Sequence, residues 1–354
     1  MDHVNHNYKM KAHSQGVLIL IALSIFAGTP SQLCAKVQPL RVHLDWIPDA
    51  EFAGIFMGIE KGWYKEAGIE IELVPAGLDT MPKLPKGQPD VGIHSGQDII
   101  QAVANGTPIR AFAANYQASP ICIVVGQDSA IKSIRDLKGK TVGIFAPQDY
   151  DTFRIMLGNN GLSLADVKTK QINTINEVEL VRMLKNREVD AIPAWEFNWT
   201  LSFPLLGYKV RVFPGYDNGF HFYGIVYFAN SEALVKNRDL LVRFLRVTIR
   251  GWREVFKDVN RAARMIVDKY YPPDRFISGS KELTFKQQMI QLKLAQRFFF
   301  EGVGKRRLGW MSEWKWKRSV DIARKFGVIP KDSQIQAKDV FDDSIIKAAQ
   351  KSTP

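Results

Sequence analysis

Two pairs of neighbouring aromatic and acidic residues are the first candidates for chemistry in this sequence: Asp45 with Trp46, and Trp195 with Glu196. An indole can stack on a planar ring, which contributes about 0.5–1.5 kcal/mol beyond the burial of area. A carboxylate can accept a hydrogen bond from a ring amino group. The two pairs therefore predict a site for a flat heterocycle. The structural alternatives are a core tryptophan with Asp45 capping a turn, and an aromatic lid with a surface Glu196.

Polar residues stand at the starts of two expected helices. Ser95 and Gln97 follow a β-rich run, and Asp149 and Tyr150 open a helix further along the chain. A helix N-terminus offers free backbone N–H groups, and open α/β sheets bind ligands at the carboxyl edge of the strands. These four residues are therefore candidates for ligand contact. Ser95 is equally a common N-cap residue, and the same alternative applies at Asp149.

His221 and Tyr223 precede a further β-rich run, where they could line the hinge side of a cleft. A lone histidine in such a position is more often structural. The sequence contains no paired-cysteine metal motif, no glycine-rich phosphate loop and no GxSxG nucleophile motif. We therefore predict a binding protein with no catalytic residues, no metal and no cofactor.

Short β-rich runs alternate with amphipathic helical stretches from Leu40 onward, which is typical of βαβ units around largely parallel sheets. A chain of 354 residues is long for one small domain, so two lobes are expected. Strands are expected at 41–44, 69–74, 90–93, 121–126, 189–192 and 225–228.

The predicted fold class is α/β, with two lobes that are each a mainly parallel sheet flanked by helices, joined by a two-strand hinge. The strand at 121–126 is expected to cross into the second lobe, and the strand at 225–228 to return. We assign residues 36–125 to the first part of the first lobe and residues 126–225 to the second lobe. Residues 226–354 are assigned to the rest of the first lobe and a helical C-terminal region.

Residues 1–35 have the layout of a secretory signal peptide: lysines, an apolar run from Val17 to Phe26, and small residues ending in Ala35. The apolar run is too short to span a bilayer stably; a retained membrane anchor is the alternative. A lipid anchor on Cys34 is disfavoured by the bulky Leu33 before it. We predict a periplasmic or other extracytoplasmic protein in which Cys122, the remaining cysteine, is a buried small hydrophobe.

The formal net charge of +12 raises the possibility of a nucleic-acid partner. Lysine and arginine are spread along the whole chain, however, and no nucleic-acid-binding motif accompanies them. We interpret the charge as favouring solubility and attraction to an anionic membrane surface, and expect no nucleic-acid partner.

Five segments resemble the branch of the periplasmic solute-binding proteins that binds pyrimidine precursors. The segments are LDWIPD at 44–49, GIEKGWYKEAGI at 58–69, DVGI at 90–93, ANGTPI at 104–109 and LKGKTVG at 137–143. This resemblance covers roughly residues 40–229. It implies a type II two-lobe fold and the capture of a ligand in the interlobe cleft for an ABC permease in the membrane. The wider superfamily also holds sulfonate, taurine and nitrate binders.

One departure from the related pyrimidine synthase concerns enzyme status. That enzyme carries a histidine at the place of Phe52 and a cysteine-rich segment, and this chain has neither. We therefore predict a monomeric, non-enzymatic binder of a thiamine pyrimidine precursor, with Phe52 among its ligand-binding residues. The alternatives are a binder of riboflavin or of an alkanesulfonate-type anion, and, less favoured, a pyrimidine-precursor synthase.

Overall fold

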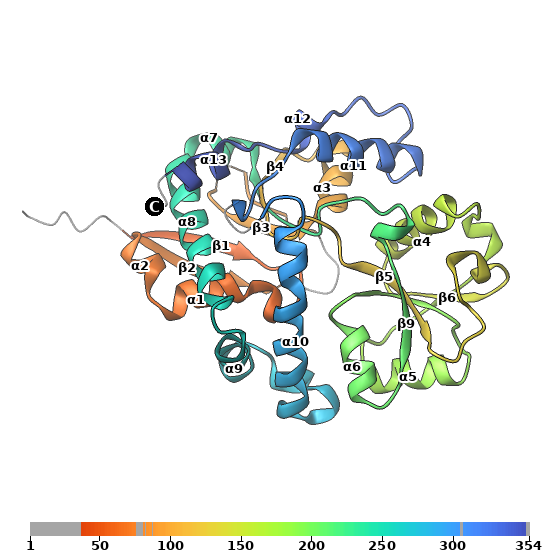
Figure 1. Ribbon diagram of the computed structural model, residues 1–354. Coiled ribbons are helices and arrows are strands. Elements are labelled where there is room, and N and C mark those ends of the chain that lie inside the picture. Colours follow the sequence, from red (N-terminus) through yellow and green to blue (C-terminus); the bar gives the residue numbers. More distant parts are fainter. Residues whose placement is uncertain (1–36, 76–80, 82, 87, 305–306, 352–354) are drawn as a thin grey trace, which may run out of the picture. The chain divides into compact units, whose positions relative to one another are not determined.

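The structure is a computed structural model that describes residues 37–75, 81, 83–86, 88–304 and 307–351 (Figure 1). The predicted signal segment, Cys34 and the expected cleavage site lie outside the described residues. In the described part of the chain, no helix is both long and apolar enough to cross a membrane.

The first sheet contains five strands, of which four point in one direction. The strand order is β2 (Ile69–Val74), β1 (Gln38–His43), β3 (Val91–Ser95), β10 (Ile225–Asn230) and β4 (Ile109–Ala114). β1 is parallel to β2 and β3, whereas β10 is antiparallel to β3 and β4. Every residue of β10 is buried, as expected for a strand with a neighbour on each side and both faces covered. We call this sheet and the helices packed on it the first lobe.

The second sheet repeats this arrangement. Its strands are β7 (Lys168–Gln171), β6 (Thr141–Ile144), β8 (Ile192–Trp195), β5 (Ile121–Gly126) and β9 (Val210–Pro214). β6 and β7 are parallel, β5 is antiparallel to both β8 and β9, and the parallel bridge Val142–Ala191 joins β6 to β8. The order β7-β6-β8-β5-β9 therefore corresponds to β2-β1-β3-β10-β4, with β5 as the reversed strand. We call this sheet and its helices the second lobe. The expected two-lobe α/β class is confirmed.

Two crossing segments connect the lobes and pair with each other. Residues 115–120 follow β4, and residues 215–224 follow β9. The N–H of Gly224 donates to the carbonyl of Tyr116 at 3.0 Å, and the N–H of Ser119 donates to the carbonyl of Phe222 at 3.0 Å. These bonds form the expected two-strand hinge.

The expected lobe boundary at residue 125 is placed too late. Among the described strands, β5 pairs with β8 and β9 of the second sheet, so the first crossing lies before Ile121. A strand's apolar pattern shows that it is buried, but it does not show which of two sheets buries it.

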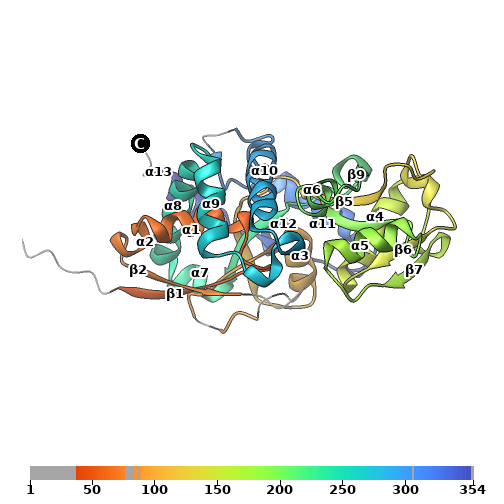
Figure 2. The same ribbon diagram turned by 90° about the horizontal axis from the view of Figure 1, so that it is seen from below.

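Helices of the first lobe pack closely on one another. Figure 2 shows α1, α8 and α9 on the same side of β1 and β2. A Cβ atom on Gly251 of α8 would lie 1.9 Å from the carbonyl oxygen of Gly54 on α1, so the two helix backbones touch. The helical elements of this lobe and the C-terminal region are η1 (Ala50–Phe52), α1 (Ala53–Glu60), α2 (Trp63–Glu66), α3 (Gly96–Ala104), α7 (Ser231–Lys236), α8 (Arg238–Val255), α9 (Val259–Lys269), η5 (Pro273–Arg275), η6 (Ile277–Gly279), α10 (Lys281–Phe300), α11 (Glu313–Lys325), α12 (Ala337–Val340) and α13 (Ser344–Lys351).

The second lobe surrounds its strands with shorter helices, as Figure 1 shows for α4, α5 and α6. Cys122 of β5 is fully buried, and burial raises the pKa of its thiol well above the usual value, as expected for a structural cysteine. The helical elements of this lobe and of the return crossing are η2 (Ile134–Leu137), α4 (Pro147–Asn159), η3 (Leu164–Asp166), α5 (Glu177–Lys185), α6 (Trp199–Leu205) and η4 (Tyr216–Asn218).

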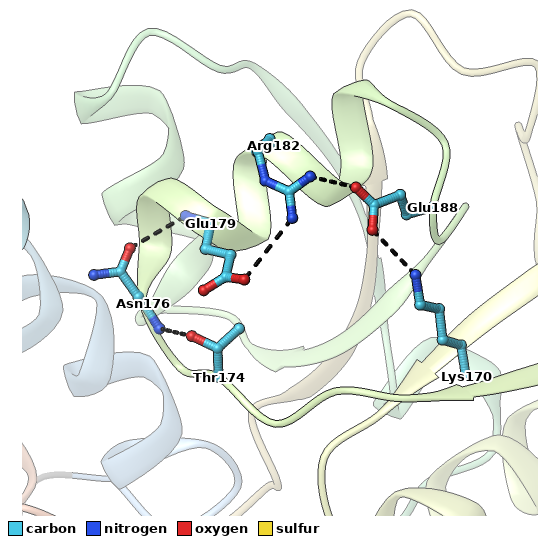
Figure 3. Close-up of polar contacts among 6 residues, drawn as sticks. All are labelled: Lys170, Thr174, Asn176, Glu179, Arg182 and Glu188. Carbon is cyan, nitrogen blue, oxygen red and sulfur yellow. Dashed lines mark hydrogen bonds and ion pairs between the residues drawn. The ribbon is translucent and has the colours of Figure 1, made fainter.

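An exposed polar network covers α5 (Figure 3). The side chain of Asn176 caps the helix by accepting from the N–H of Glu179 at 3.1 Å. Arg182 pairs with Glu179 and with Glu188, and Glu188 also accepts from Lys170 of β7 at 3.1 Å. Exposed ion pairs contribute little to stability. The apolar face of α5, which is buried in the second lobe, is therefore the main source of its stability.

Candidate functional site

A pocket of about 190 Å³ lies at the carboxyl ends of strands from both lobes. Asp45 and Trp46 follow β1, Ser95 ends β3, and Phe145 follows β6. Trp195 is the last residue of β8. The pocket therefore lies where open α/β sheets bind their ligands.

Aromatic side chains form much of the pocket wall. Trp195 meets Phe197 edge to face, with ring centroids 5.9 Å apart. Trp199 packs on Phe145 at 4.8 Å, and Trp46 is half-buried against the first-lobe core. Rings that support one another keep their orientation, so these walls can stack on a planar ligand with little further ordering.

The pocket is acidic although the protein is basic. Five carboxyl groups and one histidine line it, and among the described residues no lysine or arginine does so. The lining titratable residues are Asp45, Asp49, Glu51, His94, Asp98 and Asp149. An anionic ligand would lie among carboxyl groups with no lysine or arginine to neutralise it, whereas a cation or an amino group would find acceptors.

Asp49 and Glu51 belong to one tight turn at the start of η1. Asp49 Oδ1 accepts from the N–H of Glu51 at 2.7 Å, and Asp49 Oδ2 accepts from Gln291 of α10 at 3.4 Å. Burial raises the pKa of Asp49 to about 7, with the Asp45 charge adding to the rise and the two hydrogen bonds opposing it. Burial and the charges of Asp45 and Asp49 raise the pKa of Glu51 well above its usual value. A proton is therefore retained in this cluster near neutral pH.

Glu51 has an unsatisfied oxygen. Its side chain is 5% exposed, and Oε1 is buried without a hydrogen-bond partner among the described residues. The hydroxyl of Tyr116 is in the same condition, and its pKa is raised by burial and by the charges of Glu51, Asp49 and Asp45. Buried polar atoms normally have partners, and of the two residues Glu51 lines the pocket, so its Oε1 is a candidate for ligand contact.

A second polar group begins at the end of β3. Ser95 caps α3 by accepting from the N–H of Asp98 at 3.3 Å, and its hydroxyl donates to the Asp98 carboxylate at 2.6 Å. His94 Nδ1 lies 2.9 Å from the same carboxylate. Burial acts to raise the pKa of Asp98, but the charge and hydrogen bond of His94 and the Ser95 bond outweigh it, so this pKa is lowered.

Gln97 connects the two lobes. Its amide donates to Asp151 of α4 at 3.3 Å, and Asp151 also pairs with Arg154 at 2.6 Å. Burial raises the pKa of Asp151 to about 6, and Arg154 opposes that rise.

Six of the residues chosen from the sequence line the pocket: Asp45, Trp46, Ser95, Gln97, Asp149 and Trp195. Ser95 and Asp149 also act as helix caps, because Asp149 accepts from the N–H groups of Phe145 and Ala146 at the start of α4. The N-cap of η1, after Pro48, is Asp49.

Two other chosen residues, Glu196 and Tyr150, lie outside the pocket. Glu196 follows the end of β8 and lies in a turn. It forms an ion pair with Arg297 of α10 instead. Tyr150 is 37% exposed, because the pocket face of α4 carries Asp149 and Thr152 three positions apart and Tyr150 points away from it.

Phe52, His221 and Tyr223 are not among the residues that line the pocket. Phe52 is 1% exposed in the first-lobe core, where it packs against Phe56. His221 packs edge to face on Tyr216 at 4.5 Å, and burial lowers its pKa. Tyr223 is buried, and its hydroxyl accepts from the N–H of Ser312 at 2.9 Å.

Several lining residues were missed in the sequence. Asp49 and Glu51 stand within five positions of Trp46, and two carboxyl groups so close to a candidate stacking residue are a local signal. Trp199 follows Trp195 by four positions. Gln291 has no such signal, because it comes from α10, far along the chain.

The paired sheets, the double crossing and a pocket at the strand ends define a two-lobe α/β fold of the kind that periplasmic binding proteins have. The chain belongs to the NMT1/THI5-like family, whose sequence profile matches residues 49–262, more than half of its length. The resemblance derived from the sequence motifs is thereby confirmed.

Curated relatives extend over most of the chain. The riboflavin-binding protein RibY of Chloroflexus aurantiacus is 22% identical over 360 residues, covering 93% of this chain and 96% of its own. The formylaminopyrimidine-binding protein of Halalkalibacterium halodurans is 21% identical over 261 residues, covering 71% and 77%.

Solved structures share the fold. The periplasmic aliphatic sulphonate binding protein SsuA of Escherichia coli superposes with a TM-score of 0.59 at 15% identity, covering 87% of this chain and 99% of its own. The desulfurization enzyme DSZB superposes with a TM-score of 0.58 at 14% identity, covering 89% and 99%. At such identities the likeness concerns the fold alone, and this fold serves an enzyme as well as a binding protein.

Proposed function

We propose that this protein is the extracytoplasmic substrate-binding component of an ABC importer, which captures a small planar nitrogen heterocycle and delivers it to a membrane permease. The observation that carries the proposal is the pocket itself, in which tryptophan walls surround carboxyl groups and no described lysine or arginine is present. Aromatic rings stack on a flat ligand, and carboxyl groups accept from its N–H donors.

The size of the pocket favours a single ring. Pockets for drug-sized ligands have volumes of about 300–1,000 Å³, and this one has about 190 Å³. A thiamine pyrimidine precursor is a one-ring compound with an amino group, and a curated relative binds a formylaminopyrimidine. We therefore place a thiamine pyrimidine precursor first among the ligands.

Riboflavin is the second candidate, because a smaller cavity of about 80 Å³ adjoins the pocket and shares Trp46 and Trp199 with it. A larger ligand could extend into that space, and RibY is similar over most of the chain. An alkanesulfonate is disfavoured, since its negative charge would lie close to carboxyl groups such as Asp45 and Asp49.

We infer binding without turnover. Phe52, at the place of the synthase histidine, is a core side chain, and the thiol of Cys122 is buried with a raised pKa that keeps it protonated. Neither supplies a nucleophile or an acid–base group to the pocket. Export through the segment 1–35 and a monomeric state in solution are parts of the same proposal.

Mass spectrometry of the ligand released from natively purified protein tests the proposal. An aminopyrimidine mass near one equivalent is the expected result, and a flavin with its visible absorbance would support the second candidate. A released sulfonate would refute the assignment of a nitrogen heterocycle. If the purified protein carries no ligand, it is titrated with an aminopyrimidine, a flavin and a sulfonate in turn. Failure to bind any of the three would refute the binding function.

A further inference from the structure

Glu51 is a pocket carboxyl with spare hydrogen-bonding capacity. Glu51 is only 5% exposed and lines the pocket, and its Oε1 has no hydrogen-bond partner among the described residues. Other pocket carboxyl groups are already engaged: Asp49 by Glu51 N–H and Gln291, and Asp98 by Ser95 and His94. An unsatisfied buried acceptor destabilises the empty protein, so a ligand that supplies the missing partner gains affinity from it.

We propose that Glu51 is the specificity-determining residue of the pocket and pairs with the amidine edge of the ligand, a ring nitrogen beside an amino-bearing carbon. This inference rests on the proposed binding of a nitrogen heterocycle and adds which edge is recognised. The amino N–H donates to one Glu51 oxygen, and the protonated ring nitrogen donates to the other. Two parallel, charge-assisted bonds of this kind are strong and geometrically selective.

The proton for this pair is already in the pocket. Burial and the neighbouring charges raise the pKa of Glu51, so its carboxyl is protonated in the empty protein. On binding, this proton moves from the carboxyl oxygen to the ring nitrogen, and no proton is needed from solvent. The resulting cation lies beside Asp45 and Asp49, whose carboxyl groups favour a positive charge.

The groups around Glu51 support this direction of transfer. Asp45 and Asp49, from the same segment, act electrostatically on Glu51. Glu51 in turn acts on Tyr116 of the hinge and Tyr227 of β10. Burial raises the pKa of both tyrosine hydroxyl groups, so they stay neutral. A lactam edge, with a ring N–H beside a carbonyl, can pair with the protonated carboxyl only through two neutral hydrogen bonds, which are weaker than the two charge-assisted bonds of an amidinium with a carboxylate.

Calorimetric titration with two ligands of the same shape tests the inference. The ligand-stripped chain is titrated with 4-amino-2-methylpyrimidine and with its 4-oxo analogue. The wild type is expected to prefer the amino compound by at least about tenfold. Glu51→Gln should weaken binding of the amino compound by at least about tenfold and reduce the preference to less than about threefold, because an amide cannot pair as an anion with an amidinium.

Two variants keep this test decisive. Glu188→Gln makes the same chemical change in the exposed network on α5 (Figure 3), so it should retain the wild-type affinity and preference. Glu51→Met removes the unsatisfied carboxyl and should fold at least as stably as the wild type; it should also lose the preference. A folded Glu51→Gln or Glu51→Met variant that keeps the tenfold preference overturns the role of Glu51.

The outcomes separate this inference from the function on which it rests. Failure of the wild type to bind either pyrimidine would contradict the pyrimidine assignment itself. Binding of both with equal affinity, unchanged in Glu51→Gln, would leave the binding function intact and refute the amidine pairing. Affinity of the wild type for the amino compound should also fall as the pH rises past the raised pKa of the Glu51 carboxyl, because the shared proton is then lost.

Discussion

The buried pair Asp49 and Glu51 should make the ligand-free protein less stable as pH rises. Burial raises the pKa of Asp49 from 3.8 to about 7. Between these values the folded protein holds a proton that the unfolded chain has released, so the unfolding free energy decreases as pH rises. The stabilising contribution is complete below about pH 4 and is lost by about pH 7. One pKa unit corresponds to about 1.4 kcal/mol, so Asp49 alone accounts for roughly 4 kcal/mol.

The matched variant is Asp49→Asn combined with Glu51→Gln. Asparagine keeps an oxygen that can accept from the N–H of residue 51, so the cap of η1 is retained while both titrations are removed. Urea unfolding followed by tryptophan fluorescence, at about pH 4, 5.5, 7 and 8, gives the free energy at each pH. We expect the stability of the wild type, relative to the double variant, to fall by several kcal/mol across this range.

Parallel pH profiles would refute this reasoning. They would mean that water or a rearrangement solvates the two carboxyl groups, so that neither retains a proton at neutral pH. His221 affects the pH dependence of stability in the opposite direction. Burial lowers its pKa, so its contribution to the unfolding free energy decreases as the pH falls below 6.5. It is present in both proteins, so the difference between them isolates the acidic pair.

Three further substitutions test the packing, the wall and the lobe contact. Gly251→Ala should cost about 3 kcal/mol or more in urea unfolding, because its Cβ would lie 1.9 Å from the Gly54 carbonyl oxygen; a loss below about 1 kcal/mol would contradict that close approach. Trp46→Phe should weaken aminopyrimidine binding by about 0.5–1.5 kcal/mol and reduce the fluorescence change at saturation; wild-type values for both would remove Trp46 from the stacking wall. Glu196→Gln should change affinity by less than about threefold, since Glu196 pairs with Arg297 outside the pocket; a tenfold loss measured by calorimetry would return it to the ligand.

Much of the fold could be predicted because each local pattern agreed with its tertiary surroundings. The strands at 69–74 and 121–126 have the predicted bounds. The first alternates apolar and acidic residues and the second is an apolar run, so in each of them burial and local propensity point to the same element. The sheet to which β5 belongs could not be predicted, because its partners β8 and β9 lie far along the chain.

The site was predictable in part for a similar reason. Trp46 and Trp195 line the pocket because each ends or follows a strand at the carboxyl edge, which the local sequence reveals. Glu196 lies in the turn after β8 and pairs with Arg297 of α10, a contact between distant parts of the chain that leaves no local signal. The contact of Gln291 with Asp49 joins residues that are far apart in sequence, so it depends on the packing of α10 and leaves no local signature.

The central claim is that the acidic, tryptophan-walled pocket binds a small nitrogen heterocycle and does not transform it. Titration of the ligand-stripped protein with 4-amino-5-hydroxymethyl-2-methylpyrimidine, followed by mass spectrometry of the recovered compound, tests this most directly. We predict saturable binding of one equivalent and recovery of the unchanged compound. The account is contradicted if the protein instead binds an alkanesulfonate and ignores the pyrimidine, or if the recovered compound is a product.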